Sequence, residues 1–159
     1  MNVDAIIDAF VAHVDPPGEI LREVESAPWV EPLEAKLPRR FPASFRSLIT
    51  RYTFPAFAAG GLSFFSNTGG DSREELGVSI FKDAAIAGAT LGAGFIQFAR
   101  PDSGSYDPIC FDARRPASNR EFPVVRLDHE DILCRGGVRG LKVVAVSFYQ
   151  FAAGIASRA

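Results

Sequence analysis

Reactive and metal-binding side chains are scarce in this chain of 159 residues, which contains two cysteines and two histidines. Cys110 and Cys134 are too few for a disulfide framework and lack the paired spacing of a zinc site. We therefore expect a protein of a reducing, cytoplasmic compartment, with neither a bound metal nor a cofactor.

Long apolar runs and an N-terminal basic region are also missing. The first fifteen residues carry three aspartates and no lysine or arginine, which is the opposite of a secretory leader. No uninterrupted apolar run reaches the roughly 20 residues that span a bilayer. The closest approach, residues 84–99, is interrupted by Gly88, Gly92 and Gly94. We expect neither export by that route nor a membrane-spanning segment.

The overall composition is that of a soluble globular protein, with 47% hydrophobic and 23% charged residues. Its length fits one ordinary domain, and no repeat or long linker divides it, so a single domain over 1–159 is expected. Fourteen phenylalanines against one tryptophan predict an interior rich in aromatic rings.

The charges are unevenly distributed although the net charge is only −2. Residues 1–35 hold eight acidic residues and one basic residue, whereas residues 36–60 hold five basic residues and no acidic one. Two interpretations are open. The segments attract each other within the fold, which we favour, or they form a docking surface of two signs.

Helical periodicity marks the first third of the chain. Apolar residues recur at helical spacing from Asp4 to Val14, before Pro16 and Pro17 end the pattern. A second, shorter periodic stretch is predicted around residues 20–24. The best-formed pattern, residues 42–52, predicts a helix that lies across a sheet with its basic side outward.

After Phe54, short runs of strand-forming residues alternate with glycine and proline. Strands are predicted at residues 62–65, 78–81, 95–99, 109–111 and 124–127, with a helical turn or two over 82–91. Residues 143–155 predict a strand that changes to a helix near Ser147. The fold class is therefore α+β, a single domain in which a largely antiparallel sheet is packed by N-terminal helices and a C-terminal helix.

No catalytic set is evident. His13 lies on the acidic first helix, and His129 lies in the polar segment Asp128-His129-Glu130-Asp131. That segment could orient an imidazole or hold a cation, but a solvated turn or helix start is the favoured interpretation. Neither a Gly-x-Ser-x-Gly elbow nor a His-Glu-x-x-His motif accompanies it.

Carboxylates gather around one predicted hairpin. Residues 102–107 contain Asp102 and Asp107 with two serines and a glycine, but lack the alternating ligands and distal glutamate of a calcium loop. A hairpin turn is favoured, with Asp112 flanking it from the neighbouring strand. A metal-dependent hydrolase that uses Asp102, Asp107, Asp112 and His129 stays open as an alternative.

Direct binding of nucleic acid is not expected. The sequence pI is about 5.7, and four arginines between residues 39 and 51 are the only local basic cluster. The glycines at 88–94 and 136–140 lack the spacing of a phosphate-binding loop.

An ordered set of weak signals runs from about residue 20 to 155, and its order and spacing carry more weight than any single match. The signals are Trp29, Glu31 and Leu33, then Leu37-Pro38, the helical residues Phe41, Phe45, Leu48 and Tyr52, Gly94-Phe95-Ile96, Tyr106-Asp107, Pro123-Val124-Val125 and Ser147-Phe148-Tyr149-Gln150-Phe151. In this order they resemble the SUKH superfamily, typified by a fungal cell-wall-synthesis regulator. Two departures are the segment Glu34-Ala35-Lys36, where a glycine is usual, and Asn67-Thr68-Gly69-Gly70, which comes later than expected.

The resemblance implies an α+β domain that works by binding and is not an enzyme. Its bacterial members look like immunity proteins that neutralise a co-encoded toxin, often a nuclease or deaminase, so the expected partner is a protein. A regulatory scaffold without a toxin is the alternative, and the oligomeric state stays open. Trp29 and Tyr106 are candidate anchors of the partner surface, and Asp102, Asp107 and Asp112 are candidate charge contacts.

Overall fold

The computed structural model describes residues 2–115 and 119–158. Within them the helices are α1 (Val3–Val14), α2 (Val30–Glu34), α3 (Ala43–Arg51), α4 (Leu76–Ser79), α5 (Ala84–Gly92), α6 (His129–Arg135) and α7 (Phe148–Ala156). The strands are β1 (Arg22–Glu23), β2 (Tyr52–Thr53), β3 (Phe57–Ala59), β4 (Leu62–Phe64), β5 (Phe95–Pro101), β6 (Ile109–Asp112), β7 (Val124–Leu127) and β8 (Leu141–Ala145). None of the helices in this described part is long and apolar enough to cross a lipid bilayer.

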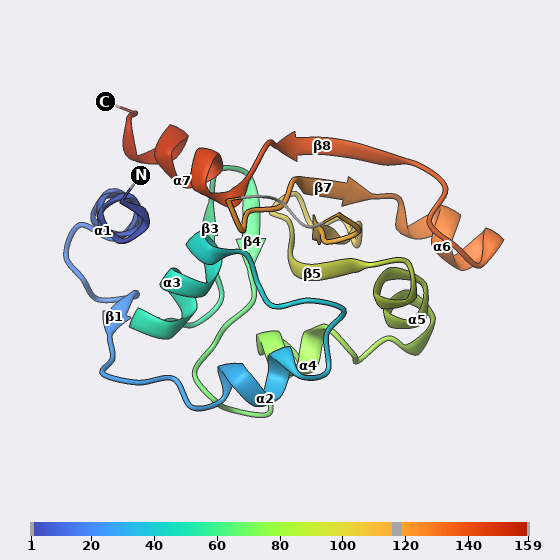
Figure 1. Ribbon diagram of the computed structural model, residues 1–159, viewed down its shortest axis with the longest axis horizontal. Helices are drawn as coiled ribbons and strands as arrows, with labels where there is room; N and C mark the ends of the chain where they lie inside the picture. The colour runs from blue at the N-terminus through green and yellow to red at the C-terminus, as the bar shows by residue number, and fades with distance from the viewer. Residues whose placement is uncertain (1, 116–118, 159) are drawn as a thin grey trace.

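Six strands form one antiparallel meander in the order β3-β4-β5-β6-β7-β8, and β1 pairs with β2 in a small separate sheet (Figure 1). Each strand of the meander pairs with the next along the chain, and α4 and α5 lie between β4 and β5, as α6 lies between β7 and β8. This confirms the predicted α+β single domain with a largely antiparallel sheet. Of the predicted range 1–159, residues 1, 116–118 and 159 lie outside the described residues.

One face of the sheet packs against α1, α3 and α7 through a cluster of phenylalanine rings (Figure 1). Phe148 lies at its centre, with its ring centroid 5.3 Å from that of Phe45 and 6.2 Å from that of Phe10. Phe98 and Phe111 stack across neighbouring strands with centroids 4.1 Å apart. The expectation of an aromatic interior is confirmed.

The opposite face packs against α5 and α6 through a smaller apolar cluster. Ile86 of α5 and Ile132 of α6 meet Phe95, Val125 and Leu127 of the sheet. Because successive residues of a strand face opposite sides, the sheet supplies side chains to both clusters. It is therefore covered on both faces, with α5 and α6 together at one end (Figure 1).

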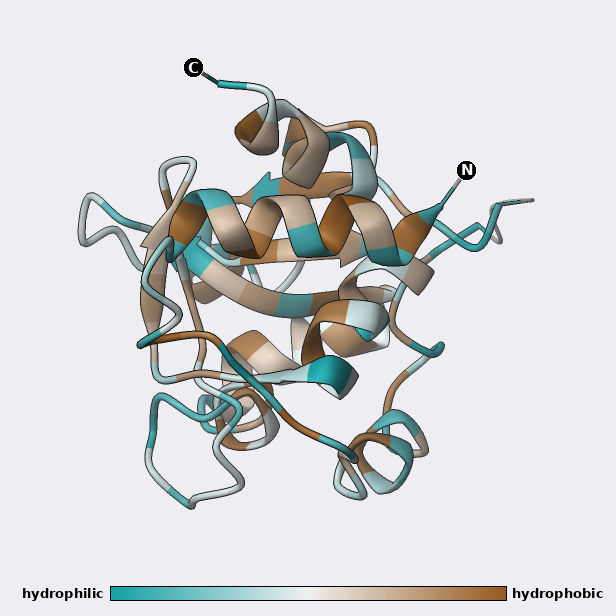
Figure 2. Ribbon diagram, turned by 90° about the vertical axis from the view of Figure 1, so that its left-hand side faces the viewer, coloured by the Kyte–Doolittle hydropathy of each residue, from teal (hydrophilic) through white to brown (hydrophobic). Residues whose placement is uncertain are grey.

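The predicted helices at both ends of the chain are confirmed, and α1 shows the expected two-sided character. Hydrophobic and hydrophilic segments alternate along α1 (Figure 2), and Ile7 and Phe10 are buried. The side chain of Asn2 accepts a hydrogen bond from the Ala5 amide and caps the first turn. At the other end, Ser147 caps α7, where the change from strand to helix is predicted.

The predicted strands at 62–65, 95–99, 109–111 and 124–127 correspond to β4, β5, β6 and β7. The strand predicted at 78–81 is wrong, because this segment continues from α4 into a turn. The amide of Ile80 donates to the carbonyl of Leu76, four residues earlier, which is the hydrogen bond of a helical turn and not of a strand ladder. The periodic stretch around residues 20–24 is also not helical, because it contains β1, which pairs with β2.

The acidic and basic segments attract each other, as the favoured interpretation predicts. Arg51 of α3 lies 2.7 Å from Asp8 and 3.6 Å from Asp4 of α1. Arg46, on the same helix, lies 3.0 Å from the buried carboxylate of Glu34. Ion pairs within the fold therefore join the acidic segment 1–35 to the basic segment 36–60.

Candidate functional site

The five predicted partner-binding residues lie in three different places. Asp102, Tyr106 and Asp107 share the loop between β5 and β6, and Tyr106 is 66% exposed. Trp29 is half-buried at the start of α2, where it packs against the main core and borders a separate groove. The structure therefore brings three of the five candidates together.

Asp112 does not flank the loop that contains Asp102 and Asp107, which corrects the prediction. It pairs with Phe95 at the beginning of β5, whereas the loop follows the end of β5. An antiparallel hairpin places these two positions at opposite ends of the strand pair. Asp112 instead forms a two-pronged ion pair with Arg114, with both nitrogen-to-oxygen distances 2.8 Å.

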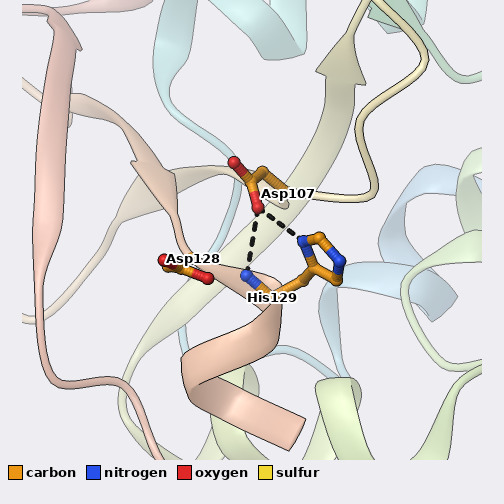
Figure 3. A group of neighbouring side chains, drawn as sticks. All are labelled: Asp107, Asp128 and His129. Atoms are coloured by element: carbon orange, nitrogen blue, oxygen red, sulfur yellow. Dashed lines mark hydrogen bonds and ion pairs between the residues drawn. The ribbon is translucent and has the colours of Figure 1, made fainter.

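Asp107 is the centre of a polar network that joins the β5–β6 loop to β7 and α6. Figure 3 shows its carboxylate bonded to His129 at the start of α6. Its Oδ1 accepts hydrogen bonds from the main-chain amide of His129 at 3.1 Å and from Nδ1 of the same residue at 2.6 Å. Its Oδ2 accepts one from Nε of Arg126 at 2.7 Å. We call Asp107, Arg126 and His129 the Asp107 network.

Asp107 is ionised at neutral pH. Its partial burial acts to raise the carboxyl pKa, but the hydrogen bonds from His129 and Arg126 outweigh burial and lower the pKa from 3.8 to about 2. Because an ionised carboxylate only accepts hydrogen bonds, Nδ1 of His129 carries the shared proton. Nε2 of the imidazole is thereby left available on the other side of the ring.

The sequence segment around His129 is a helix start, which was the favoured interpretation. Asp128 accepts hydrogen bonds from the amides of Glu130 at 2.9 Å and Asp131 at 3.2 Å, which caps α6. This explains why acidic residues cluster at this point in the sequence. His129 is the first residue of α6, so the capped first turn of the helix fixes the position of its main chain and Cβ.

Ligand atoms of Asp107, Asp128 and His129 lie within 4.8 Å of one another, as a metal site requires. Both oxygens of Asp107 and Nδ1 of His129, however, already bond within the Asp107 network. Arg126 supplies the positive charge that the carboxylate needs. The geometry therefore fits an electrostatic tie between loop, strand and helix better than it fits a metal centre.

A pocket of about 240 Å³ lies beside this network, between α5, α6 and β5; we call it the α5–α6 pocket. His129 and Leu133 line it from α6, Gln97 and Arg100 from β5, and Tyr106 from the loop. Sequence reasoning missed Gln97 and Arg100. The available signal was a polar residue inside the otherwise apolar stretch 95–99.

β8, one of the two edge strands of the large sheet, has mostly exposed side chains. It lies at the edge of the sheet (Figure 1) and pairs only with β7 among the described strands. Four exposed apolar side chains lie along it and just after it. Leu141 is 38% exposed, Val143 61%, Val144 38% and Val146 76%. We call these four residues and the free side of the strand the β8 edge.

No protein-family model and no curated protein matches the chain. The resemblance to the SUKH superfamily therefore stays a prediction.

Proposed function

We propose that this protein is a non-enzymatic binding domain that takes up an extended strand of another protein at the β8 edge. The observation that carries the proposal is the set of exposed apolar residues on a strand that has a neighbour on one side only among the described strands. Soluble proteins usually protect such edges, because free main-chain groups and apolar side chains invite further strand pairing. An unprotected edge is therefore a candidate interface.

The two ends of the sheet support this interpretation by their contrast. β3, at the opposite end, has three residues, and its Phe57 is buried. The turn that follows β3 packs against α7, because a Cβ placed on Gly60 would lie 2.7 Å from Ile155. β8 has five residues, its first four are exposed, and no equivalent cover lies over it in the described residues. The two edge strands therefore differ in length, in burial and in the contacts of the neighbouring turn.

The chemistry of the edge defines the partner segment. An added strand gains main-chain hydrogen bonds along β8, and its alternate side chains meet apolar neighbours such as Val143 and Val144. Arg126 and Lys142 border a shallow groove beside the first residues of β8, together with Asp107, Asp128 and Asp131. We therefore expect an apolar extended segment flanked by polar residues of both signs.

The resemblance to the SUKH superfamily extends the proposal to an immunity protein that neutralises a toxin encoded beside it. Tyr106, Asp102 and Trp29 remain proposed contacts of that partner. A cytoplasmic location is part of the proposal, and the exposed thiol of Cys134 is compatible with a reducing compartment. A regulatory scaffold would use the same edge for a partner that is not a toxin.

The test is co-purification with the product of the adjacent gene, using wild-type protein and two lysine variants. Val143→Lys introduces a charge on the β8 edge, and Ile20→Lys introduces the same charge at an exposed apolar residue elsewhere. The proposal expects Val143→Lys to weaken binding at least about tenfold and Ile20→Lys to leave it unchanged.

Besides the absence of any complex with wild-type protein, two outcomes contradict this proposal. The first is a wild-type complex that Val143→Lys leaves intact. The second is a homodimer that Val143→Lys dissociates, while binding of the adjacent gene's product is unchanged. In that case the β8 edge is the interface between two copies of this chain. Light scattering on the isolated protein separates that second outcome from binding of a different protein.

The metal-dependent hydrolase remains the alternative of another class, and its specific support is the closeness of Asp107, Asp128 and His129. Asp112 cannot contribute, because it lies at the far end of β6. A divalent cation that raises the melting temperature of wild-type protein, but not of His129→Gln, supports this alternative. Catalytic turnover by wild-type protein that is lost in His129→Gln would refute the binding proposal and support the hydrolase.

A further inference from the structure

The α5–α6 pocket has an apolar wall and a polar wall. Ile80, Ile86, Ala87 and Leu133 contribute apolar surface, whereas Gln97 and Arg100 face it from β5. Its volume of about 240 Å³ exceeds the roughly 150 Å³ of an engineered apolar cavity that binds benzene. The pocket can therefore hold the body of a small organic molecule.

Gln97 is the first sign that the pocket has a polar ligand. The residue is only 4% exposed, and its Nε2 has no hydrogen-bond acceptor anywhere in residues 2–115 and 119–158. Buried amide groups are almost always hydrogen-bonded, because an unmet donor in an apolar interior is costly. Since Gln97 lines the pocket, a ligand in the pocket is the available source of the acceptor.

Arg100 is the second sign. Its buried Nε likewise has no acceptor, and its guanidinium forms no ion pair with any acidic residue of the described chain. The guanidinium carbon lies 5.2 Å from the ring centroid of Tyr106 and 5.9 Å from that of Phe65. These rings hold the group in place by cation–π contact and leave its hydrogen-bond donors unused.

The other charged groups around Arg100 favour an anion. Arg73 and Lys82 border the adjoining cleft, and burial together with the nearby Arg100 and Arg73 lowers the pKa of Lys82. Asp83 is the acidic residue that lines both the α5–α6 pocket and the adjoining cleft. Its carboxylate is committed to the start of α5, where it accepts from the amides of Ala85 and Ile86 at 3.1 and 3.2 Å.

We propose that the α5–α6 pocket binds a carboxylate attached to an apolar body of about five to ten non-hydrogen atoms. The carboxylate pairs with the guanidinium of Arg100 and accepts from the amide of Gln97. The apolar body packs against Ile86 and Leu133. The same chemistry is carried by a free small organic acid and by the C-terminus of a polypeptide that ends in an apolar residue.

The test uses hexanoate as the probe, with hexanamide and hexanol as neutral controls of the same length. In ¹⁵N-labelled protein, hexanoate should shift the side-chain amide signals of Gln97 and the Nε signal of Arg100, with a Kd of about 0.1–1 mM. Hexanamide should bind at least about tenfold more weakly, because the charge-assisted contacts are missing.

Three variants separate a specific site from a general effect on the fold. Arg100→Met should weaken hexanoate binding at least about tenfold, whereas Arg139→Met, which removes the same charge from an exposed position, should change it less than about twofold. Leu133→Trp fills the pocket from the exposed side of α6 and should abolish binding without unfolding the protein. The Val143→Lys variant of the β8 edge should bind hexanoate normally, so the two proposals can fail independently.

The peptide acetyl-Gly-Leu and its C-terminal amide distinguish the two sources of the carboxylate. Tighter binding of the free-acid peptide than of hexanoate assigns the site to a polypeptide terminus, and the reverse order assigns it to a small acid. The proposal is overturned if hexanoate leaves the Gln97 and Arg100 signals unmoved, if hexanamide binds as well as hexanoate, or if Arg100→Met binds like wild type.

Discussion

Replacing Asp107 with asparagine keeps the shape of the side chain but removes the charge at the centre of the Asp107 network. The carboxyl pKa is 3.8 in an unfolded chain and about 2 in the folded protein. At 1.36 kcal/mol for each pH unit, that difference corresponds to about 2 kcal/mol of folding free energy at neutral pH. The Asp107 side chain is 16% exposed but that of Arg126 is 40% exposed, so water screens their ion pair in part and about 2 kcal/mol is an upper bound.

The pH dependence of this contribution has a definite sign. Because the folded-state pKa lies below the unfolded value, the stabilisation is complete above about pH 5 and declines as the pH falls toward 2. At pH 3 about half of it is lost, so the difference between wild type and Asp107→Asn should fall from about 2 to about 1 kcal/mol.

Urea unfolding at pH 7 and pH 3, followed by the fluorescence of the single tryptophan, Trp29, measures this difference. Asp102→Asn is the matched control, because Asp102 lies in the same loop but is exposed, and it should cost less than about 0.5 kcal/mol. A loss below about 0.5 kcal/mol for Asp107→Asn, or a loss that is equal at both pH values, would refute the proposed electrostatic tie.

Three further predictions concern the core and the charged helix pair. Phe148→Ala should destabilise the fold by about 3–5 kcal/mol in urea unfolding, because the ring is fully buried among other phenylalanines; a cost under about 1 kcal/mol contradicts this. Gly60→Ala should cost more than about 1 kcal/mol, since φ is +59° and the new Cβ would meet Ile155; an unchanged midpoint excludes this reasoning. Burial and the hydrogen bond to Asp8 raise the pKa of Tyr52 to about 12, so an absorbance titration should find one tyrosine that ionises near pH 12. Because the folded-state pKa is raised, the folding free energy should decline above pH 10. Ionisation of all tyrosines near pH 10 contradicts this prediction.

The helix ends and the sheet order were largely predictable, because local chemistry decides them. Ser147 begins α7 with a hydroxyl that caps the Gln150 amide, and the sequence shows a change from strand to helix at the same place. The strands pair with their nearest neighbours in the chain, as the prediction of an antiparallel meander requires, although α4 and α5 separate β4 from β5 and α6 separates β7 from β8.

The errors have a shared physical cause, which is contact between residues far apart in sequence. The segment around Ile80 has strand-like composition, but its main chain forms helical turns, with Leu76 and Ile80 buried in the main core. Arg22 pairs with Thr53 across thirty positions, and no periodicity within residues 20–24 reveals that partner. Short apolar runs have no preference strong enough to resist such contacts.

The candidate site was predicted only in part. Asp107 and His129 were singled out from composition, but their hydrogen bond depends on how the β5–β6 hairpin meets α6. Arg126 was overlooked because a lone arginine in a strand has no local signature. The exposure of β8 could not be foreseen, since a valine-rich strand is as typical of a sheet interior as of an edge.

Binding at the β8 edge is the central claim, and titration calorimetry with the product of the adjacent gene tests it most directly. The account predicts that wild-type protein and Ile20→Lys bind with equal affinity, whereas Val143→Lys binds at least about tenfold more weakly while its circular dichroism is unchanged. Equal affinity for all three proteins, or no heat of binding with any of them, would contradict it.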